Sequence, residues 1–463
     1  MKEPDTLSGI PLRVEKQKKF FASGNTRSLA FRRARLEELY TTIKAMEPEI
    51  TRAFREDMNK SSFESYVTET ALLLKEIRYH LRHLKKWARP KRVATPLIHF
   101  PATSHIVPEP YGSVLILSPW NYPFLLLFSP LIGALSAGNC AVLKPSGRVP
   151  ALNSVFRKII ERTFPPEYVS IFTGGHDISN KLLEEPFDYI FFTGSKQVGR
   201  KVMAAAARHL TPVSLELGGK NPCIVHHDAA AETAARRIIW GKFVNAGQTC
   251  VAPDYLMVHA SIRENFTGHL LRTLKSFYGE NASRTEDLTR IVGRDNVYRL
   301  QELIAGSNIL YGGQTNPDDH YVAPTLIDGI GPHHEVMEEE IFGPVLPLLT
   351  YNTTEELLEV TQKHPNPLSL YVFSRNKKFI KTILEKVPSG TAAINETVTQ
   401  FVNEHLPFGG RGESGTGAYH GRFSFDTFSH HRGILKKGTW LDIPFRYPPY
   451  TKKNLQRIKM FLK

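Results

Sequence analysis

The sequence predicts an α/β protein with two sheets of mainly parallel strands. From residue 112 onward, short apolar runs alternate with segments whose apolar residues recur at helical spacing. Strands that alternate with helices in this way form parallel sheets covered by helices on both faces. A second alternation of the same kind begins after residue 221. The chain has 463 residues, a length that favours two or three domains over a single core.

The individual elements follow from these patterns. Residues 26–89 are expected to be helical, because leucine and isoleucine recur there at helical spacing. Residues 93–110 combine prolines and β-branched residues without a helical period, which predicts an extended arm or hairpin. The first alternation predicts strands at residues 113–117, 141–144, 169–173, 189–193 and 213–217, with helices at 124–137, 151–164, 178–184 and 199–210. The second predicts helices at 229–244 and 262–277 and strands at 255–259, 346–350, 370–373 and 391–395.

Composition restricts the class of protein. The chain contains only three cysteines, which argues against a disulfide framework and favours a reducing compartment. Residues 1–20 are charged and lack the apolar region of a signal peptide. We therefore expect a cytoplasmic protein. No metal site is expected, because the sequence has no HExxH motif and its cysteines lack ligand spacing.

The formal net charge is +14. A basic surface could attract nucleic acid or anionic lipid, but the basic clusters are short. We therefore interpret the charge as a solvated basic face and expect no nucleic-acid partner. The basic tail, residues 446–463, mixes apolar and basic residues at helical spacing. It could lie on a membrane surface as a peripheral contact or pack on the protein itself.

Cys250 ends a small polar loop and is a candidate nucleophile, although most cysteines are simply buried as small hydrophobic residues. A thiol nucleophile needs a base. Glu216, in a Gly-rich turn after an apolar run, could serve as one. It also needs a donor for the oxyanion it creates, and the amide of Asn121, in a turn flanked by prolines, could supply it. Taken alone, Glu216 could be an exposed loop carboxylate and Asn121 a turn residue bonded to its own backbone.

Two segments of the first alternation indicate a nucleotide site. Lys144 follows an apolar run, and a lysine at the carboxyl end of a strand suits a ribose hydroxyl or a phosphate. The run at residues 192–199 predicts a strand, a Gly-rich turn and a helix. Backbone N–H groups at the start of such a helix favour a pyrophosphate, which makes Gly194, Ser195 and Gly199 candidate cofactor residues.

A third segment, residues 338–344, combines an acidic run with an abrupt Gly-Pro stop. It could be an exposed acidic turn, or Glu340 could bind a ribose while Phe342 packs on a ring. By contrast, residues 410–415 fit the dinucleotide pattern GxGxxG, which is meaningful only inside a βαβ unit. No clear strand precedes them and no βαβ pattern follows. We therefore expect a flexible structural loop there.

Together and in this order, these motifs resemble those of the aldehyde dehydrogenase superfamily over roughly residues 20–440. The matching motifs are PWNYP with Asn121, KPS with Lys144, FTGS at 192–195, LELGGK with Glu216, GQTC with Cys250 and EEIFGP with Glu340. The INET segment at 394–397 and the motifs between residues 406 and 430 are similar to family 3, which includes fatty and aromatic aldehyde dehydrogenases.

The resemblance implies NAD(P)-dependent oxidation of aldehydes, medium- or long-chain aliphatic or aromatic, to carboxylic acids. Cys250 would form a thiohemiacetal and then a thioester. The Asn121 amide and the Cys250 backbone N–H would hold the oxyanion, and Glu216 would activate water. The resemblance further implies cofactor contacts: Lys144 at the adenosine ribose, Gly194 and Ser195 near the pyrophosphate, and Glu340 with Phe342 at the nicotinamide ribose.

The chain departs from the family at one position. The family commonly has KPSE, and Gly147 stands here in place of that glutamate. In the family this acid disfavours a 2′-phosphate, so its absence predicts that NADP is tolerated alongside or instead of NAD. The apolar tunnel for the aldehyde could be lined by Tyr66, Trp120, Tyr122, Phe401 and His420, although the sequence alone does not place them.

The resemblance also implies a domain organisation and a homodimer. A Rossmann-like, parallel-sheet cofactor domain would comprise residues 1–92 and 111–217, and an α/β catalytic domain residues 218–420. Residues 93–110 and 421–445 would form a small β oligomerisation arm, and residues 446–463 the basic tail. Two alternatives remain open. One is an acyl-CoA or acyl-phosphate reductase of the same superfamily, against which Glu216 argues. The other is a non-catalytic basic binding protein.

Overall fold

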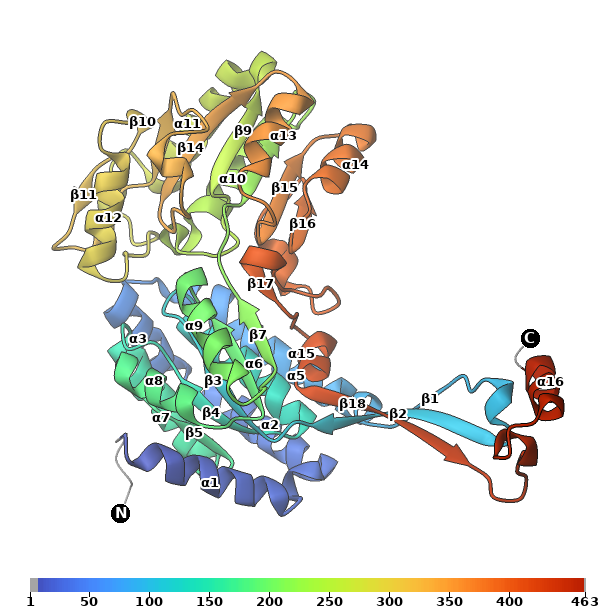
Figure 1. The fold of residues 1–463 in the computed structure, drawn as a ribbon. Coiled ribbons are helices and arrows are strands. Elements are labelled where there is room, and N and C mark those ends of the chain that lie inside the picture. Colours follow the sequence, from blue (N-terminus) through green and yellow to red (C-terminus); the bar gives the residue numbers. More distant parts are fainter. Residues whose placement is uncertain (1–6, 462–463) are drawn as a thin grey trace.

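The structure is a computed structural model that describes residues 7–461. The chain forms two lobes, one above the other in Figure 1, and a narrow arm that leaves the lower lobe. Residues 1–6 and 462–463 lie outside the described part, so the expectations for the N-terminus and for the basic tail fall partly beyond it.

The lower lobe is built around a six-stranded sheet in the order β17-β7-β6-β3-β4-β5. Its strands are β3 (Ser113–Leu117), β4 (Cys140–Lys144), β5 (Val169–Ile171), β6 (Tyr189–Thr193), β7 (Val213–Glu216) and β17 (Gly415–Thr416). The first five run parallel, whereas β17 is antiparallel to β7. The last strand therefore brings a distant part of the chain to the edge of this sheet.

Alternate residues of β3 bury opposite faces of the sheet, as a strand requires. Val114 and Ile116 belong to one apolar cluster, and Leu115 and Leu117 belong to another. The helices that contribute to the first cluster are α2 (Leu29–Ala45), α3 (Glu47–Met58), α5 (Ala71–Trp87), α6 (Pro123–Ala137), α7 (Pro150–Thr163) and α15 (Arg422–Thr427). Those of the second are α1 (Gly9–Ala22), α8 (His176–Glu184) and α9 (Lys196–Ala207). Helices thus cover both faces, as predicted.

The upper lobe contains a seven-stranded sheet in the order β10-β13-β14-β9-β8-β15-β16. Its strands are β8 (Pro222–Val225), β9 (Tyr255–His259), β10 (Asn308–Tyr311), β13 (Thr325–Asp328), β14 (Val345–Tyr351), β15 (Ser369–Phe373) and β16 (Thr391–Ile394). Edge strand β10 is antiparallel, and the other strands run parallel. The lobe also contains α10 (Ala231–Phe243), α11 (Arg263–Tyr278), α12 (Arg294–Ile304), α13 (Thr354–Gln362), α14 (Lys377–Lys386) and the pair β11 (Thr315–Asn316) and β12 (Tyr321–Val322).

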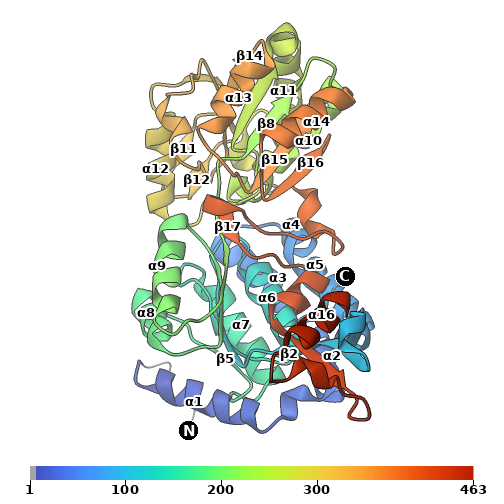
Figure 2. The ribbon, with the colours of Figure 1, turned by 45° about the vertical axis from the view of Figure 1, so that its right-hand side comes forward.

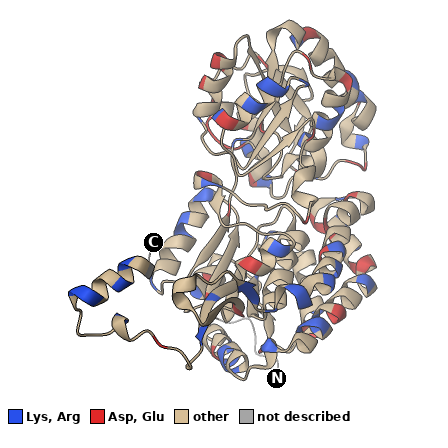
Figure 3. Cartoon of the chain, turned by 90° about the vertical axis from the view of Figure 1, so that its right-hand side faces the viewer, with Lys and Arg blue, Asp and Glu red and all other residues tan. Residues whose placement is uncertain are grey.

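The arm is a three-stranded antiparallel sheet of β1 (Lys91–Val93), β2 (Ala102–Pro110) and β18 (Ser429–Lys437). It projects away from both lobes in Figure 1, and in Figure 2 it comes forward in front of the lower lobe. At its far end lies α16 (Lys452–Phe461), where Figure 3 shows a concentration of basic residues. The extended arm predicted at 93–110 is therefore observed, and the tail forms the basic helix that its spacing indicated.

The predicted α/β class is confirmed, and the expected strands differ from the observed ones by no more than two residues at either end. Among the expected helices, α9 differs most from its predicted position at residues 199–210. It begins three residues early, at Lys196, because the Ser195 hydroxyl accepts the Val198 N–H and caps the helix. Helix α1 was not predicted. Its buried face includes Gln17, which donates to the Ala141 carbonyl at 2.8 Å and interrupts the apolar pattern.

Candidate functional site

A cavity of about 900 Å³ lies between the two lobes. Its lower wall is formed where β3, β6 and β7 end, and open α/β sheets bind ligands at the carboxyl ends of their strands. The predicted site residues that line it are Asn121, Gly194, Ser195, Glu216, Cys250, Glu340 and Phe342. Residues separated by up to half of the chain are thus brought to one place.

A sharp turn carries Cys250 into the cavity. Asn245 and Ala246 have φ angles of 55° and 52° within the turn η4 (Val244–Gly247). Such angles are unfavourable for residues other than glycine and persist only where the surrounding contacts hold them. Beyond the turn, the Asn221 side-chain amide donates to the Cys250 carbonyl at 2.7 Å. The loop is therefore held on both sides of the thiol.

Burial, followed by the nearby carboxyl groups of Glu340 and Glu216, raises the pKa of the Cys250 thiol to about 12. The backbone N–H groups of Cys250 and Val251 act in the opposite direction, because they donate to the sulfur and favour the thiolate. A thiol with this pKa requires a base or a positive charge close by to become a nucleophile.

Glu216 is the last residue of β7 and is 3% exposed. Neither of its carboxyl oxygens has a hydrogen-bond partner among residues 7–461. Burial raises the pKa of this carboxyl well above its ordinary value, as in general acid–base groups that act near neutral pH. The interpretation of Glu216 as an exposed loop carboxylate is wrong.

Asn121 lies buried at the carboxyl end of β3. Its side-chain amide donates to the Gln248 carbonyl at 2.9 Å, not to its own backbone, which excludes the simple turn interpretation. Since an amide carries two N–H bonds, the second can serve another acceptor in the cavity. The neighbouring Tyr122 hydroxyl lies 2.7 Å from the Thr249 hydroxyl, so this turn and the Cys250 loop are joined twice.

Glu340 lies against the turn that follows β7. Burial, followed by the charge of Asp254, raises the pKa of its carboxyl to about 8, and the Gly219 N–H donates to it. A Cβ atom at Gly218 would lie 1.8 Å from the Glu340 Oε2 atom, so any other residue there would displace this carboxyl group. Phe342 packs edge-on against Trp120, with ring centroids 5.4 Å apart.

Gly194 and Ser195 form the turn between β6 and α9, and the N-terminus of α9 faces the cavity. Two predicted cofactor residues do not line it. Gly199 is buried in α9, where a Cβ atom would lie 2.7 Å from a methyl carbon of Leu217. Lys144 is buried at the end of β4 and donates to the Pro145 and Gly174 carbonyls, each at 2.9 Å.

The GxGxxG segment leads into β17 and not into a helix, which is consistent with a structural loop. Its Glu413 nevertheless lines the cavity and pairs with Lys196 at 3.0 Å. Of the residues considered for an apolar tunnel, Trp120 lines the large cavity, whereas Phe401 and His420 line a separate hollow of about 30 Å³. Tyr122 is buried, and Tyr66 is 42% exposed.

Sequence reasoning missed the groups that hold the Glu340 segment. The buried Lys220 ammonium donates to the Asp254 carboxylate at 2.5 Å and to the Glu339 carbonyl at 2.6 Å. Asp254 in turn accepts the Ile341 N–H at 3.0 Å. Lys220 stands in the recognised motif LELGGK, which was the available signal, but its partners are far away in the sequence.

All three cysteines are free thiols. Within residues 7–461, no three His, Cys, Asp or Glu side chains are grouped to hold a metal ion. The helices of this same part of the chain are too short or too polar to cross a membrane.

Comparisons with known proteins agree with this geometry. The model of the aldehyde dehydrogenase family matches residues 12–434. The chain is 44% identical over 448 residues to 4,4'-diaponeurosporen-aldehyde dehydrogenase of Staphylococcus aureus, covering 96% of this chain and 97% of that protein. It is 40% identical to the mouse aldehyde dehydrogenase family 3 member A2, covering 96% of this chain and 92% of the relative.

Solved structures give the same result. The substrate-bound state of Staphylococcus aureus AldH superimposes with a TM-score of 0.96 at 43% identity, over 98% of this chain and 99% of that chain. An indole-3-acetaldehyde dehydrogenase in complex with NAD⁺ superimposes with a TM-score of 0.85 at 26% identity, over 93% and 89% of the two chains. The chain therefore belongs to the aldehyde dehydrogenase family, is similar to its family 3 members, and is an NAD(P)-dependent enzyme that oxidises aldehydes.

Proposed function

We propose that Cys250 is the nucleophile, Glu216 the general base and Asn121 the oxyanion donor of this enzyme. One observation carries the proposal: a thiol, a buried carboxyl without a partner among the described residues, and an amide with one uncommitted N–H line the same cavity. A thiol ester forms and is hydrolysed most readily where these three groups meet.

The cavity residues fit a nicotinamide dinucleotide. The volume of about 900 Å³ lies in the range of small-molecule sites. The start of α9, with Gly194 and Ser195, offers backbone N–H groups to a pyrophosphate. Glu340, held against Gly218, offers carboxylate oxygens to ribose hydroxyls, and Phe342 packs beside them. The bound nicotinamide would supply an acceptor for hydride and a positive charge that favours the Cys250 thiolate.

The residues of the chain then divide the reaction among them. The Cys250 sulfur bonds to the aldehyde carbon, and the Asn121 amide and the Cys250 backbone N–H stabilise the oxyanion of the thiohemiacetal. Departure of hydride from that carbon leaves a thioester. Glu216 takes a proton from water, the water oxygen attacks the thioester carbon, and the C–S bond breaks. Glu216 returns its proton to the departing sulfur, so the products are a carboxylic acid and the regenerated thiol.

Two residues outside the cavity wall also contribute to cofactor binding, Gly199 indirectly and Lys144 by direct contact. Gly199 lets α9 approach Leu217 closely, which sets the position of the helix N-terminus. Lys144 has three N–H bonds, and two donate to backbone carbonyls. The third remains for an adenosine ribose hydroxyl. Burial lowers the pKa of this ammonium to about 8, so a bound oxygen would favour its charged form.

The enzyme is proposed to use both NAD and NADP. Gly147 is exposed and carries no carboxylate that would repel a 2′-phosphate. The aldehyde is proposed to be a medium- or long-chain aliphatic or an aromatic one. This is supported by the similarity of the chain to aldehyde dehydrogenases of family 3.

We further propose that two chains associate through the arm, giving a homodimer. Apolar side chains are exposed on and near it, including Leu435 at 50% and Trp440 at 72%. We propose that the lower lobe serves as the cofactor domain and the upper lobe as the catalytic domain, although β17, within the expected catalytic range 218–420, belongs to the sheet of the lower lobe. Free thiols support a cytoplasmic location, and the basic surface of α16 supports peripheral contact with anionic membranes.

The test is Cys250→Ser with a panel of aldehydes and both cofactors. Loss of turnover with every aldehyde, while NAD still binds, is expected. Iodoacetamide should inactivate the native enzyme in step with labelling of Cys250. Aldehyde oxidation that persists after complete labelling would overturn the assignment.

A further inference from the structure

A fully buried ion pair lies next to the Asn121 turn, where the mechanism assigns it no role. The Lys60 ammonium and a Glu69 carboxylate oxygen are 2.9 Å apart, and both side chains are 0% exposed. Removing two charges from water is costly and is rarely justified by stability alone. Glu69 lies in a π-helical segment (Tyr66–Thr70) between α4 (Ser62–Ser65) and α5, a distortion that is frequent at functional sites.

The pair contacts the residues that follow Asn121. The second carboxylate oxygen of Glu69 accepts the N–H groups of Phe124 at 2.9 Å and Leu125 at 3.2 Å, in the first turn of α6. The Lys60 ammonium lies 4.6 Å from the centre of the Tyr122 ring. The position of the Asn121 turn is therefore fixed from its carboxyl side.

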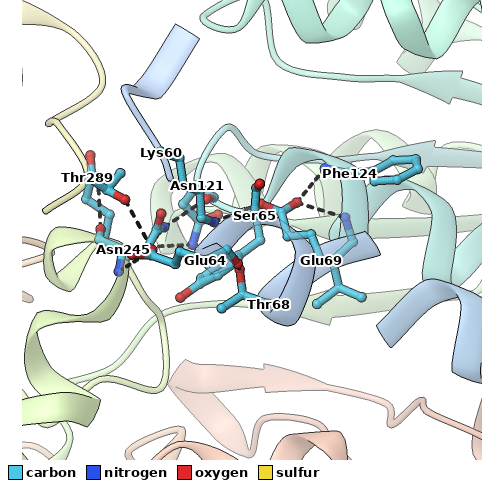
Figure 4. Close-up of polar contacts among 12 residues, drawn as sticks. Lys60, Glu64, Ser65, Thr68, Glu69, Asn121, Phe124, Asn245 and Thr289 are labelled. Carbon is cyan, nitrogen blue, oxygen red and sulfur yellow. Dashed lines mark hydrogen bonds and ion pairs between the residues drawn. The ribbon is translucent and has the colours of Figure 1, made fainter. Parts of the chain in front are cut away.

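A second carboxyl from the same segment, half-buried, holds the Cys250 loop. Glu64 accepts the Asn245 backbone N–H at 2.9 Å and the Thr289 hydroxyl at 3.1 Å. Asn245, which has a positive φ angle, donates its side-chain amide to the Asn121 carbonyl at 2.8 Å. Figure 4 shows these contacts as two neighbouring groups, one from Thr289 through Glu64 to Asn245 and Asn121, and one from Lys60 through Glu69 to Phe124.

We propose that Lys60, Glu64 and Glu69 are positioning residues that hold the Asn121 amide in register with the Cys250 thiol. This inference rests on the proposed function of Asn121 and Cys250. The segment at residues 60–69 links the two residues, because Glu69 binds the backbone that follows Asn121 and Glu64 binds the loop that precedes Cys250. Oxyanion stabilisation depends on donors that are fixed before the reaction begins, and a displacement of about 1 Å can cost roughly 100-fold in rate.

The decisive experiment is Glu64→Ala, measured in the native enzyme and in Asn121→Ala. In the native background we expect kcat to fall by roughly 10- to 100-fold, with the dissociation constant for NAD unchanged within about twofold. In the Asn121→Ala background the same change should lower kcat by less than about twofold, because the group that it positions is gone. The proposal would be overturned if Glu64→Ala lowered kcat by the same factor in both backgrounds. It would also be overturned if the dissociation constant for NAD rose by as large a factor as kcat fell.

Two further variants separate positioning from stability. Glu64→Gln keeps an oxygen that can accept both hydrogen bonds, and it should restore most of the kcat that Glu64→Ala loses. If kcat of Glu64→Gln is as low as that of Glu64→Ala, the hydrogen bonds accepted by Glu64 do not position the site. The matched control is Asp57→Asn, since Asp57 caps α7 by accepting the Ala151 and Leu152 N–H groups, and none of these residues lines the cavity. It should lower Tm without lowering kcat.

If Glu64→Ala does not fold, Glu69→Gln is measured in the same two backgrounds instead. The fall in kcat that Glu69→Gln causes in the native background should likewise disappear in the Asn121→Ala background. A loss that persists there contradicts the proposal. Failure of the proposed function is distinguished at once, because Asn121→Ala alone would then leave kcat unchanged. If Asn121→Ala has a lowered kcat while Glu64→Ala and Glu69→Gln are fully active, the proposed role of Asn121 stands. The positioning role of residues 60–69 is then refuted.

Discussion

Gly218→Ala should weaken cofactor binding by moving a single carboxylate. The new methyl carbon would lie 1.8 Å from Glu340 Oε2, whereas ordinary van der Waals contact begins at 3.4 Å. The carboxylate must therefore retreat by roughly 1.5 Å. Because the obstructing atom is the far end of a side chain, the protein should still fold. A displacement of this size exceeds the tolerance of a hydrogen bond.

Below pH 8 this carboxyl keeps its proton, so a lost hydrogen bond to it is worth about 0.5–1.5 kcal/mol, which corresponds to a roughly 2- to 10-fold increase in the NAD dissociation constant. Calorimetric titration or quenching of protein fluorescence measures this constant directly. Gly331→Ala is the matched control, because a Cβ atom there meets nothing within 4 Å. The same substitution of Gly218 in a Glu340→Ala background should have no further effect. An unchanged dissociation constant, or equal losses in both backgrounds, would refute the reasoning.

Three further predictions concern the same cavity. Glu216→Gln should retain the first burst of reduced cofactor but slow steady-state release of the acid; an unchanged steady-state rate would dismiss Glu216 as the base. The Glu340 carboxyl retains its proton to about pH 8 in the folded chain, against a reference pKa of 4.5. Folding therefore binds a proton, and its contribution to stability is lost as pH rises between these values. Glu340→Gln should then raise Tm relative to the native chain at pH 9 more than at pH 5, and an equal shift at both would contradict this. The ratio of kcat/KM for NAD to that for NADP should stay below about 100 and should rise in Gly147→Glu; a larger ratio in the native enzyme would exclude dual use.

The sequence could predict the sheets because a buried parallel strand is a local pattern. Residues 113–117 and 189–193 are continuous apolar runs, and their bounds match β3 and β6. Helix α1 could not be recognised, since Gln17 is buried through hydrogen bonds to Ser113 and Ala141, partners that lie far along the chain. Local periodicity carries no information about such partners.

The site shows the same division. Cys250, Glu216 and Asn121 each stand in a short motif, so composition and order sufficed to select them. Glu64 and Glu69 stand in no such motif. Their role follows from contacts with Asn245 and the start of α6, where Glu69 is fully buried and Glu64 half-buried, and the folded chain alone reveals these contacts.

The arrangement of charges explains why the cavity needs this much support. Cys250, Glu216 and Glu340 are three acidic groups that line one cavity, and burial raises the pKa of each. Their part in the reaction depends on separations that are fixed before it begins. Fixed separation requires rigid backbone on both sides of the cavity. The lower side is held through Glu69 at the start of α6, and the upper side through Lys220 and Asp254. The buried ion pairs of this protein are therefore best understood as parts that keep its reactive groups at constant distance.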